Sequence, residues 1–262
     1  PAPQVFSRTA SALLVYQELV EDALAKGARG VRALSEIDFG STPEGLEENL
    51  RFEAVATIAL SNQPLWNVCL YDVRRRPEQV LDESARAHTH LVFGRERQAN
   101  PGYLHPAELL RRHSQTTPYD LEAHEPNVTA SDLRATGLAE LRGRLHVVAR
   151  TQSALSTDRV DEFIEAVNEL VTNALKHGAG RVDLKLWARD EQLVCTITDQ
   201  GRGFDDPLAG FLPVPIDTLP QNGAGLWLAR NFSDSLNFTR TSHGFTARVS
   251  SWSHRDQGYA PS

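Results

Sequence analysis

The chain has 262 residues, and its 27 Lys and Arg against 34 Asp and Glu give a formal net charge of −7. This acidic balance disfavours nucleic acid and anionic membranes as partners, because both favour a surplus of Lys and Arg. At 40% hydrophobic and 23% charged residues the composition is globular. The length predicts two domains at roughly 100–200 residues each. No apolar run reaches the roughly 20 residues of a membrane-spanning helix, and no secretory signal peptide is recognisable at the start.

The two cysteines and the absence of methionine carry separate information. Cys69 and Cys195 lie in different strand-like apolar stretches, which predicts reduced core residues of a cytoplasmic protein rather than a disulfide pair. The chain begins with Pro1 and contains no Met, so we expect the translated protein to have residues upstream of it. The first domain is therefore expected to be incomplete at its N-terminus.

The first part of the chain alternates between helical and strand-like patterns. Helices are expected at residues 10–26, 43–62 and 77–92, and strands at 30–37 and 65–73. Such alternation favours an α/β layer with parallel strands. We assign residues 1–97 to this domain. Residues 98–131, where Pro, Gly and Asn are scattered without periodicity, are assigned to a linker.

A second unit is expected over residues 132–254, beginning with a partly helical stretch in which LHVVAR has the pattern of a strand. The clearest helix of the chain covers 158–177, with Asp158 as its N-cap. Strands are expected at 181–189, 192–199, 236–241 and 244–252, and a short helix at 225–235. These elements predict an α+β sandwich: helices on one face of a mixed, mainly antiparallel sheet that runs as a meander.

Four polar residues share one ridge of the helix at 158–177. Asn173, Lys176 and His177 follow Glu169 at four, seven and eight residues. A carboxylate, a carboxamide and a cation in this arrangement can position a water molecule, a divalent metal and a phosphate. A solvated edge of an amphipathic helix is the alternative.

Glycine-rich motifs follow the second strand of this unit. D-x-G-x-G, at Asp199, Gly201 and Gly203, offers a carboxylate to an exocyclic amine and lets the backbone approach a flat base. G-x-G-L, at Gly223, Gly225 and Leu226, opens a helix whose free N–H groups favour an anion. Residues 205–222 between them contain four prolines and predict a mobile lid. Thr246, on the last strand, is the fourth candidate.

In this order, E-x-x-x-N-x-x-x-H, D-x-G-x-G, G-x-G-L and the strand threonine resemble the GHKL ATPase superfamily, which has the Bergerat ATP-binding fold. The form ELVTNALKHG most resembles the anti-sigma factor serine kinases, and the resemblance covers roughly residues 139–252. A Walker-type phosphate loop is absent from the sequence.

The resemblance implies a role for each motif residue, with ATP and Mg²⁺ as cofactors. Asn173 would ligate Mg²⁺, and Glu169 would be the general base. Asp199 would bind the adenine amine, assisted by Thr246 through a water molecule. The remaining positions would shape the adenine pocket (Gly201, Gly203), close the lid on the phosphates (Gly223, Gly225, Leu226) and flank the phosphates (Lys176, His177).

In the first unit, GVRALSEID, NLRFEAVATIAL, WNVCLYD, AHTHLV and NPGYLHP together resemble the MEDS sensory domain. The resemblance implies a sensor of a small-molecule ligand. Cys69, Tyr71 and Asp72 are candidates for its pocket, with a core role for Cys69 and a strand-end cap for Asp72 as the alternative. His88-x-His90 offers two metal ligands without a third at suitable spacing, and the basic run 74–76 is expected to be a solvated loop.

The leading hypothesis is an ATP-binding regulator of transcription and stress response that resembles anti-sigma factors. It would hold a sigma factor or, as a protein serine/threonine kinase, phosphorylate a STAS-domain anti-anti-sigma protein. A nucleotide-binding sensor module without catalysis is the alternative. A sensor histidine kinase is disfavoured, because no dimerising helix pair with a phospho-accepting His precedes residue 150 and His146 falls in LHVVAR. Kinases of this group often dimerise, so a homodimer is compatible with the sequence.

Overall fold

The computed structural model describes residues 9–36, 43–74, 77–113, 118–211, 224–242 and 244–253. In chain order its elements are α1 (Thr9–Ala25), β1 (Val31–Glu36), α2 (Pro43–Ala59), β2 (Leu65–Leu70), α3 (Glu78–Ala85), β3 (His90–Phe93), β4 (Glu96–Ala99), α4 (Pro106–Arg112), the 3-10 helix η2 (Asp120–Ala123), β5 (Val128–Ala130), α5 (Leu138–Gln152), α6 (Thr157–His177), β6 (Asp183–Arg189), β7 (Gln192–Asp199), α7 (Ala224–Asn231), β8 (Ser235–Thr241) and β9 (Gly244–Trp252). None of the helices in these segments is long and apolar enough to cross a bilayer.

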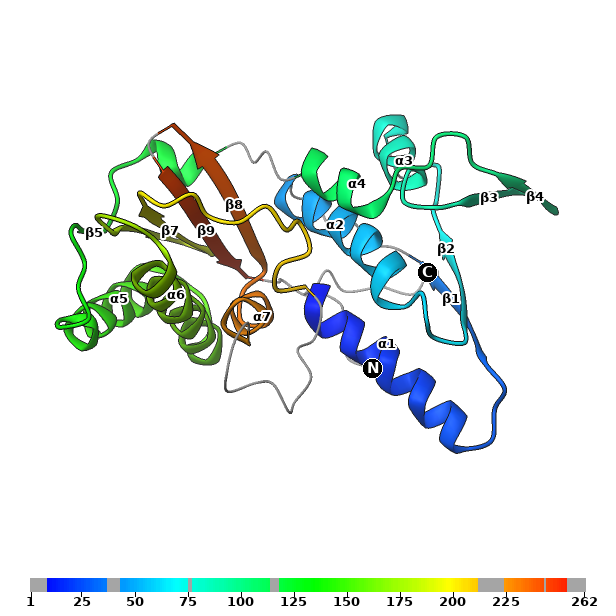
Figure 1. The fold of residues 1–262 in the computed structure, drawn as a ribbon, viewed down its shortest axis with the longest axis horizontal. Coiled ribbons are helices and arrows are strands. Elements are labelled where there is room, and N and C mark those ends of the chain that lie inside the picture. Colours follow the sequence, from blue (N-terminus) through cyan, green and yellow to red (C-terminus); the bar gives the residue numbers. More distant parts are fainter. Residues whose placement is uncertain are drawn as a thin grey trace.

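The N-terminal part is the expected α/β layer. β1 and β2 pair in parallel, with Val31 opposite Leu65, and α1 and α2 lie to one side of the pair (Figure 1). The prediction of one helix over 77–92 is wrong in its second half, because α3 ends at Ala85 and β3 and β4 form an antiparallel hairpin. Asn100 ends the helix by donating to the carbonyl oxygens of Ala85 and His88, at 2.7 and 2.8 Å.

The segment 98–131 carries elements that belong to both parts of the molecule. α4 packs on α2 and buries Leu109 and Leu110 in the N-terminal core. β5 pairs with β6 and forms one edge of the C-terminal sheet, with Val128 opposite Leu186. Short elements separated by prolines give no periodicity, so the sequence did not indicate them.

The C-terminal part is a five-stranded sheet in the order β5-β6-β7-β9-β8, and every pairing in it is antiparallel. The expected fold class is confirmed: α5 and α6 cover one face of this sheet (Figure 1). The predicted meander is wrong, because β9 lies between β7 and β8. The core buries the apolar stripe of α6 against the sheet; the stripe consists of Val160, Phe163, Ile164, Ala166, Val167, Leu170, Val171 and Ala174.

Two local predictions about the helices on this face are corrected. LHVVAR is part of α5, because Leu141, Leu145 and Ala149 repeat at four residues and are buried against the same core. The N-cap of α6 is Ser156, whose Oγ accepts from the Arg159 amide at 3.4 Å, so Asp158 is the second helical residue rather than the cap.

The two parts meet where α1 approaches α7 (Figure 1). Phe211 is 2% exposed and packs with Leu13, Val55 and Leu109 in one buried cluster, here called the interdomain cluster. Arg230 of α7 stacks over the Phe211 ring at 3.6 Å. The end of the segment 204–211 is therefore anchored in the N-terminal core.

Candidate functional site

Glu169 and Asn173 lie one turn apart on α6, and both are half-buried. The first turn of α7 lies directly against them. A Cβ added to Gly225 would lie 2.7 Å from Glu169 Oε2 and 3.2 Å from Asn173 Nδ2, so a larger residue at this position would displace the Glu169 side chain. Two motifs that are about fifty residues apart in sequence thus lie together.

Asp199 ends β7 and is 6% exposed. Its Oδ1 accepts from the Gly201 amide at 2.6 Å and from the Ala179 amide at 3.4 Å, which fixes the carboxylate in orientation. Within the described ranges no residue donates to Oδ2. One oxygen is therefore left for an external donor such as an exocyclic amine.

Thr246 lies on β9, next to the residue that pairs with Asp199, and its side chain is on the opposite face of the sheet from the carboxylate. It pairs with Thr198 across β7 and β9, and the two hydroxyl oxygens are 2.9 Å apart. Its neighbour Phe245 packs against Gly203, which has a φ of 60°. Thr246 and Gly203 therefore lie at the same end of the sheet as Asp199.

The other expected site residues make none of the contacts described for Glu169, Asn173 and Asp199. Lys176 and His177 are exposed at the C-terminal end of α6 and make no hydrogen bond or ion pair within the part of the chain that the structure describes. Leu226 is half-buried and packs on the core rather than beside Asp199. Gly223 and most of the expected lid, residues 212–222, lie outside the described residues.

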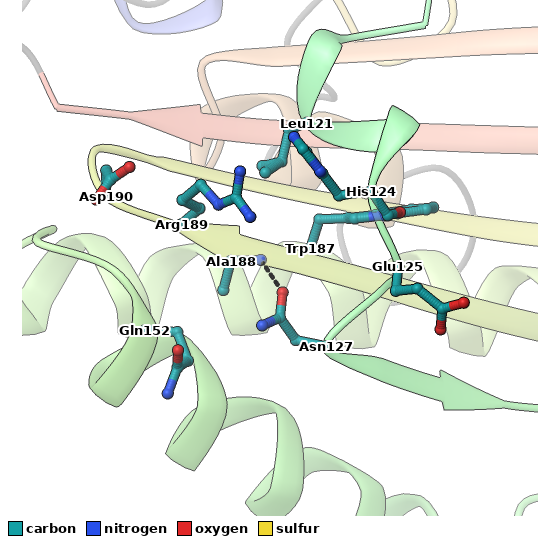
Figure 2. Close-up of a pocket in the computed structure, with 9 residues that line it drawn as sticks. All are labelled: Leu121, His124, Glu125, Asn127, Gln152, Trp187, Ala188, Arg189 and Asp190. Atoms are coloured by element: carbon teal, nitrogen blue, oxygen red, sulfur yellow. Dashed lines mark hydrogen bonds between the residues drawn. The ribbon is translucent and has the colours of Figure 1, made fainter.

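A cavity of about 220 Å³ lies elsewhere, between η2, the segment before β5 and the end of β6 (Figure 2). Trp187 Nε1 donates to the His124 carbonyl at 2.8 Å, and Asn127 Oδ1 accepts from the Ala188 amide at 2.8 Å. None of the residues that line it belongs to the expected nucleotide motifs.

Of the pocket candidates of the first unit, Cys69 and Tyr71 stay together in the structure, whereas Asp72 does not join them. Asp72 turns away to accept from the Arg74 amide at 3.0 Å and to pair with its guanidinium at 2.8 Å, as a strand-end cap does. Arg75 and Arg76 lie outside the described residues. Tyr71 instead donates to Glu53, a buried carboxylate on α2 that sequence reasoning missed. The only signal for Glu53 was a carboxylate on the apolar side of a helix, between Phe52 and Ala54.

Comparisons with known proteins match both parts of the chain. Residues 131–250 match the family described as histidine kinase-like ATPase domain. Residues 2–89 match the family described as MEDS, the methanogen/methylotroph, DcmR sensory domain. Among solved structures, the histidine kinase domain of the Erythrobacter litoralis blue-light activated histidine kinase is 14% identical and covers 79% of this chain and 90% of its own, with a TM-score of 0.25. A score this low does not establish a shared fold. No match was found among curated proteins.

Proposed function

We infer that this chain, which joins a MEDS sensory domain to a histidine kinase-like ATPase domain of the GHKL type, is a signalling regulator that binds ATP between α6, α7 and the end of β7. The observation that carries the proposal is the contact of Gly225 with Glu169 and Asn173. Both residues lie in the C-terminal half of α6, and this helix ends beside Asp199. Gly178, which follows α6, lies against the Asp199 carboxylate and links the two halves of the site.

Base recognition falls to Asp199 in this proposal. Its Oδ2 accepts the adenine amine, while the Gly201 amide holds Oδ1 in place. A carboxylate that is already oriented loses little entropy when the base binds. Thr246 is hydrogen-bonded to Thr198 on the opposite face of the sheet, so this proposal gives it no contact with the base.

The donor set on α6 suits a magnesium nucleotide. Amide and carboxylate oxygens are the ligands that Mg²⁺ prefers, and Asn173 and Glu169 offer both at one point on the helix. When bound, Mg²⁺ would neutralise charge on the phosphates. Asn173 would hold it, and Glu169 would remain to accept a proton from an attacking hydroxyl. Gly225, without a Cβ, leaves space between these side chains and α7.

We propose further that the acceptor is a serine hydroxyl of a STAS-domain protein and that a sigma factor is the second partner, as ELVTNALKHG suggests. Phosphoryl transfer requires mainly positioning and charge neutralisation, which this site can supply. The interdomain cluster supports regulation by the sensory domain, because Phe211 connects the start of the expected lid to α2. A nucleotide-binding module without transfer remains the second candidate, and homodimerisation is compatible with both.

A histidine kinase is less compatible with the position of His146. His146 lies on α5 and not on a strand. Because α5 buries Leu141 and Leu145 against the ATPase core, it is not free to form a separate dimerising pair. His146 Nε2 is also 2.6 Å from Asp161 on α6.

Calorimetric titration with ATP and with ADP, with and without Mg²⁺, tests nucleotide binding. Asp199→Asn replaces one acceptor oxygen by a donor NH₂ group, so we expect affinity to fall by about a hundredfold, equivalent to about 2.7 kcal/mol. Asp22→Asn, on the exposed side of α1, is the matched control and should bind as wild type does. Wild-type protein that binds neither nucleotide would overturn the proposed site, and equal binding by Asp199→Asn would remove Asp199 from it.

Transfer is separated from binding by Glu169→Gln, which keeps the shape of the side chain against Gly225 and removes its basicity. We expect phosphorylation of a STAS-domain protein to fall at least about a hundredfold, the usual contribution of a general base, while ATP affinity changes little. Glu165→Gln, one turn earlier on α6 and paired with Arg142, is the control. If wild-type protein binds ATP but transfers no phosphate, the kinase proposal fails and the non-catalytic module stands.

A further inference from the structure

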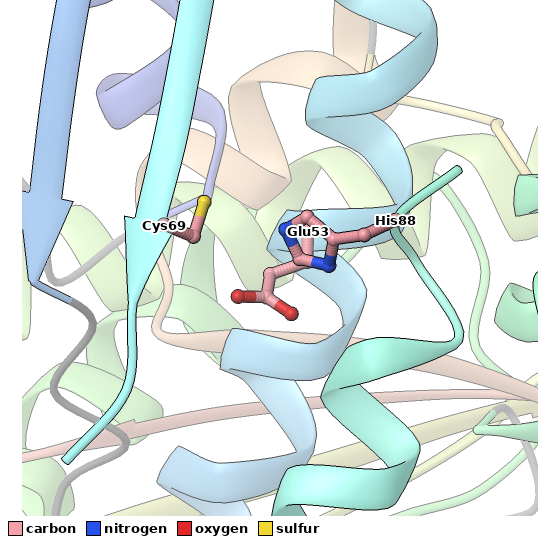
Figure 3. Close-up of side chains that lie close together, drawn as sticks. All are labelled: Glu53, Cys69 and His88. Carbon is pink, nitrogen blue, oxygen red and sulfur yellow. The ribbon is translucent and has the colours of Figure 1, made fainter. Parts of the chain in front are cut away.

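Three side chains with metal-binding chemistry meet in the N-terminal domain. Glu53 comes from α2, Cys69 from β2 and His88 from the turn after α3 (Figure 3). One oxygen, the sulfur and one ring nitrogen all lie within 4.8 Å of one another. The residues are 16 and 19 positions apart along the chain, so the parallel β1–β2 layer and its helices assemble the cluster.

The Glu53 carboxylate is only half satisfied by the protein. Tyr71 donates its hydroxyl to Oε1. Oε2 is buried and has no hydrogen-bond partner, and the residue as a whole is 4% exposed. An unsatisfied buried oxygen destabilises a fold by about 1–3 kcal/mol. The unsatisfied Glu53 Oε2 therefore points to a bound partner that would satisfy it.

The other two ligands are oriented as metal ligands usually are. His88 Nδ1 lies 3.0 Å from the Ser84 carbonyl oxygen; with the proton assigned to Nδ1 as the donor, the lone pair is on Nε2. Asn67 Nδ2 donates to Cys69 Sγ at 3.6 Å, a contact that stabilises a thiolate. Both His88 and Cys69 are half-buried, so solutes can reach the cluster.

While no metal is bound, burial opposes charge on all three side chains. Burial raises the pKa of the Glu53 carboxyl to about 8 and that of the Cys69 thiol to about 12, and burial lowers the pKa of His88. Near neutral pH the carboxyl and the thiol therefore hold their protons, and the imidazole is neutral. These groups form no ion pair with one another that would account for their proximity.

We propose that Glu53, Cys69 and His88 bind a zinc ion, with a fourth coordination position open to water or to a small ligand. A sulfur, an imidazole nitrogen and a carboxylate oxygen are the three donor types that Zn²⁺ takes in proteins, and three protein ligands with an open position are typical of its reactive sites. The thiol and carboxyl protons leave to solvent as the ion binds. The proposed zinc site shares no residue with the proposed nucleotide site, because all three ligands lie in the N-terminal domain.

This assignment resolves the pair His88-x-His90. His90 is exposed on β3 and hydrogen-bonds to Thr89 at 3.1 Å, so it takes no part in the cluster. The other two ligands of the proposed zinc site come from α2 and β2. Their distance in sequence explains why no spacing pattern revealed them.

The test uses the untagged full chain, stripped of metal and titrated with Co²⁺ and then with Zn²⁺. We expect one ion per chain and a thiolate-to-cobalt charge-transfer band that Zn²⁺ abolishes. Cys69→Ser should remove the band, and Glu53→Gln and His88→Gln should each weaken Zn²⁺ binding more than about tenfold. The matched controls His90→Gln and Cys195→Ala should bind as wild type does.

The wild-type spectrum needs no variant, so a substitution that prevents folding leaves the proposal testable. Wild-type protein that shows no charge-transfer band, or a band that survives Cys69→Ser, would overturn it. So would equal weakening by His90→Gln and His88→Gln. ATP titrations of the same preparations distinguish a failure of the zinc proposal from a failure of the proposed nucleotide site.

Discussion

Replacing Arg159 by alanine is expected to lower the free energy of unfolding by about 3 kcal/mol, because the change leaves a buried carboxylate without its cation. Arg159, on the first turn of α6, pairs with Asp234, whose side chain is fully buried. Asp234 also accepts from the Trp252 amide at 2.8 Å, and Arg159 donates to the Trp252 carbonyl at 3.2 Å. The pair therefore ties the start of α6 to the start of β8 and the end of β9. This loss is at the lower end of the range for broken buried ion pairs, because the Trp252 amide still donates to Asp234.

Chemical denaturation followed by circular dichroism measures this change. Arg134→Ala, which removes the same side chain from an exposed pair with Asp132, should leave the unfolding midpoint where it is. Adding Asp234→Asn to Arg159→Ala should recover part of the loss, because no charge is then buried. A loss below about 1 kcal/mol in Arg159→Ala would mean that other donors satisfy Asp234.

The sequence predicted α6 because that helix has a long, regular apolar stripe. Phe163, Val167, Leu170 and Ala174 repeat at helical spacing, which fixes the side on which Asn173 lies. The second half of α5 was assigned to a strand because Val147 and Val148 are adjacent β-branched residues, typical of strands. Burial of its stripe against α6 outweighs that local preference.

The order of the strands was not available from the sequence. β8 and β9 form a hairpin, and either could have paired with β7, because both alternate in the same way. The structure places β9 there, which brings Thr246 opposite Thr198. The alternation of side chains along a strand shows which residues share a face of the sheet. Which strands are neighbours depends on the connection through α7.

Glu53 and Phe211 show what sequence patterns leave out. Glu53 lies on the apolar side of α2, where helical periodicity alone predicts a core residue. Phe211 follows a proline-containing stretch that predicted only a lid, yet it is buried among residues more than a hundred positions earlier in the chain. Both depend on contacts between distant segments, which periodicity does not encode.

Removal of the Phe211 side chain is expected to lower the free energy of unfolding by about 3–4 kcal/mol, since truncation of a buried phenylalanine loses its transfer energy and leaves a cavity. The cavity opens between α1, α2 and α4, at Leu13, Val55 and Leu109. Arg230 loses the ring that it stacks over but keeps its hydrogen bonds to the carbonyl oxygens of Ala209 and Leu236, at 2.9 and 2.8 Å. We therefore expect α7 to stay folded while residues 204–211 detach from the sensory domain.

Denaturation curves and amide hydrogen exchange measure the two effects together. Phe211→Ala should increase exchange across residues 204–211 and in the facing turns of α1 and α2, whereas Phe211→Leu, which fills most of the cavity, should lose less than about 1.5 kcal/mol. Phe93→Ala is the matched control: this side chain is 64% exposed, and its removal should change stability by no more than about 0.5 kcal/mol. If Phe211→Ala were as mild as Phe93→Ala, the anchor would not exist in solution. The proposed route from the sensory domain to the nucleotide site would then lose its physical basis, while the site itself would still be testable through Asp199.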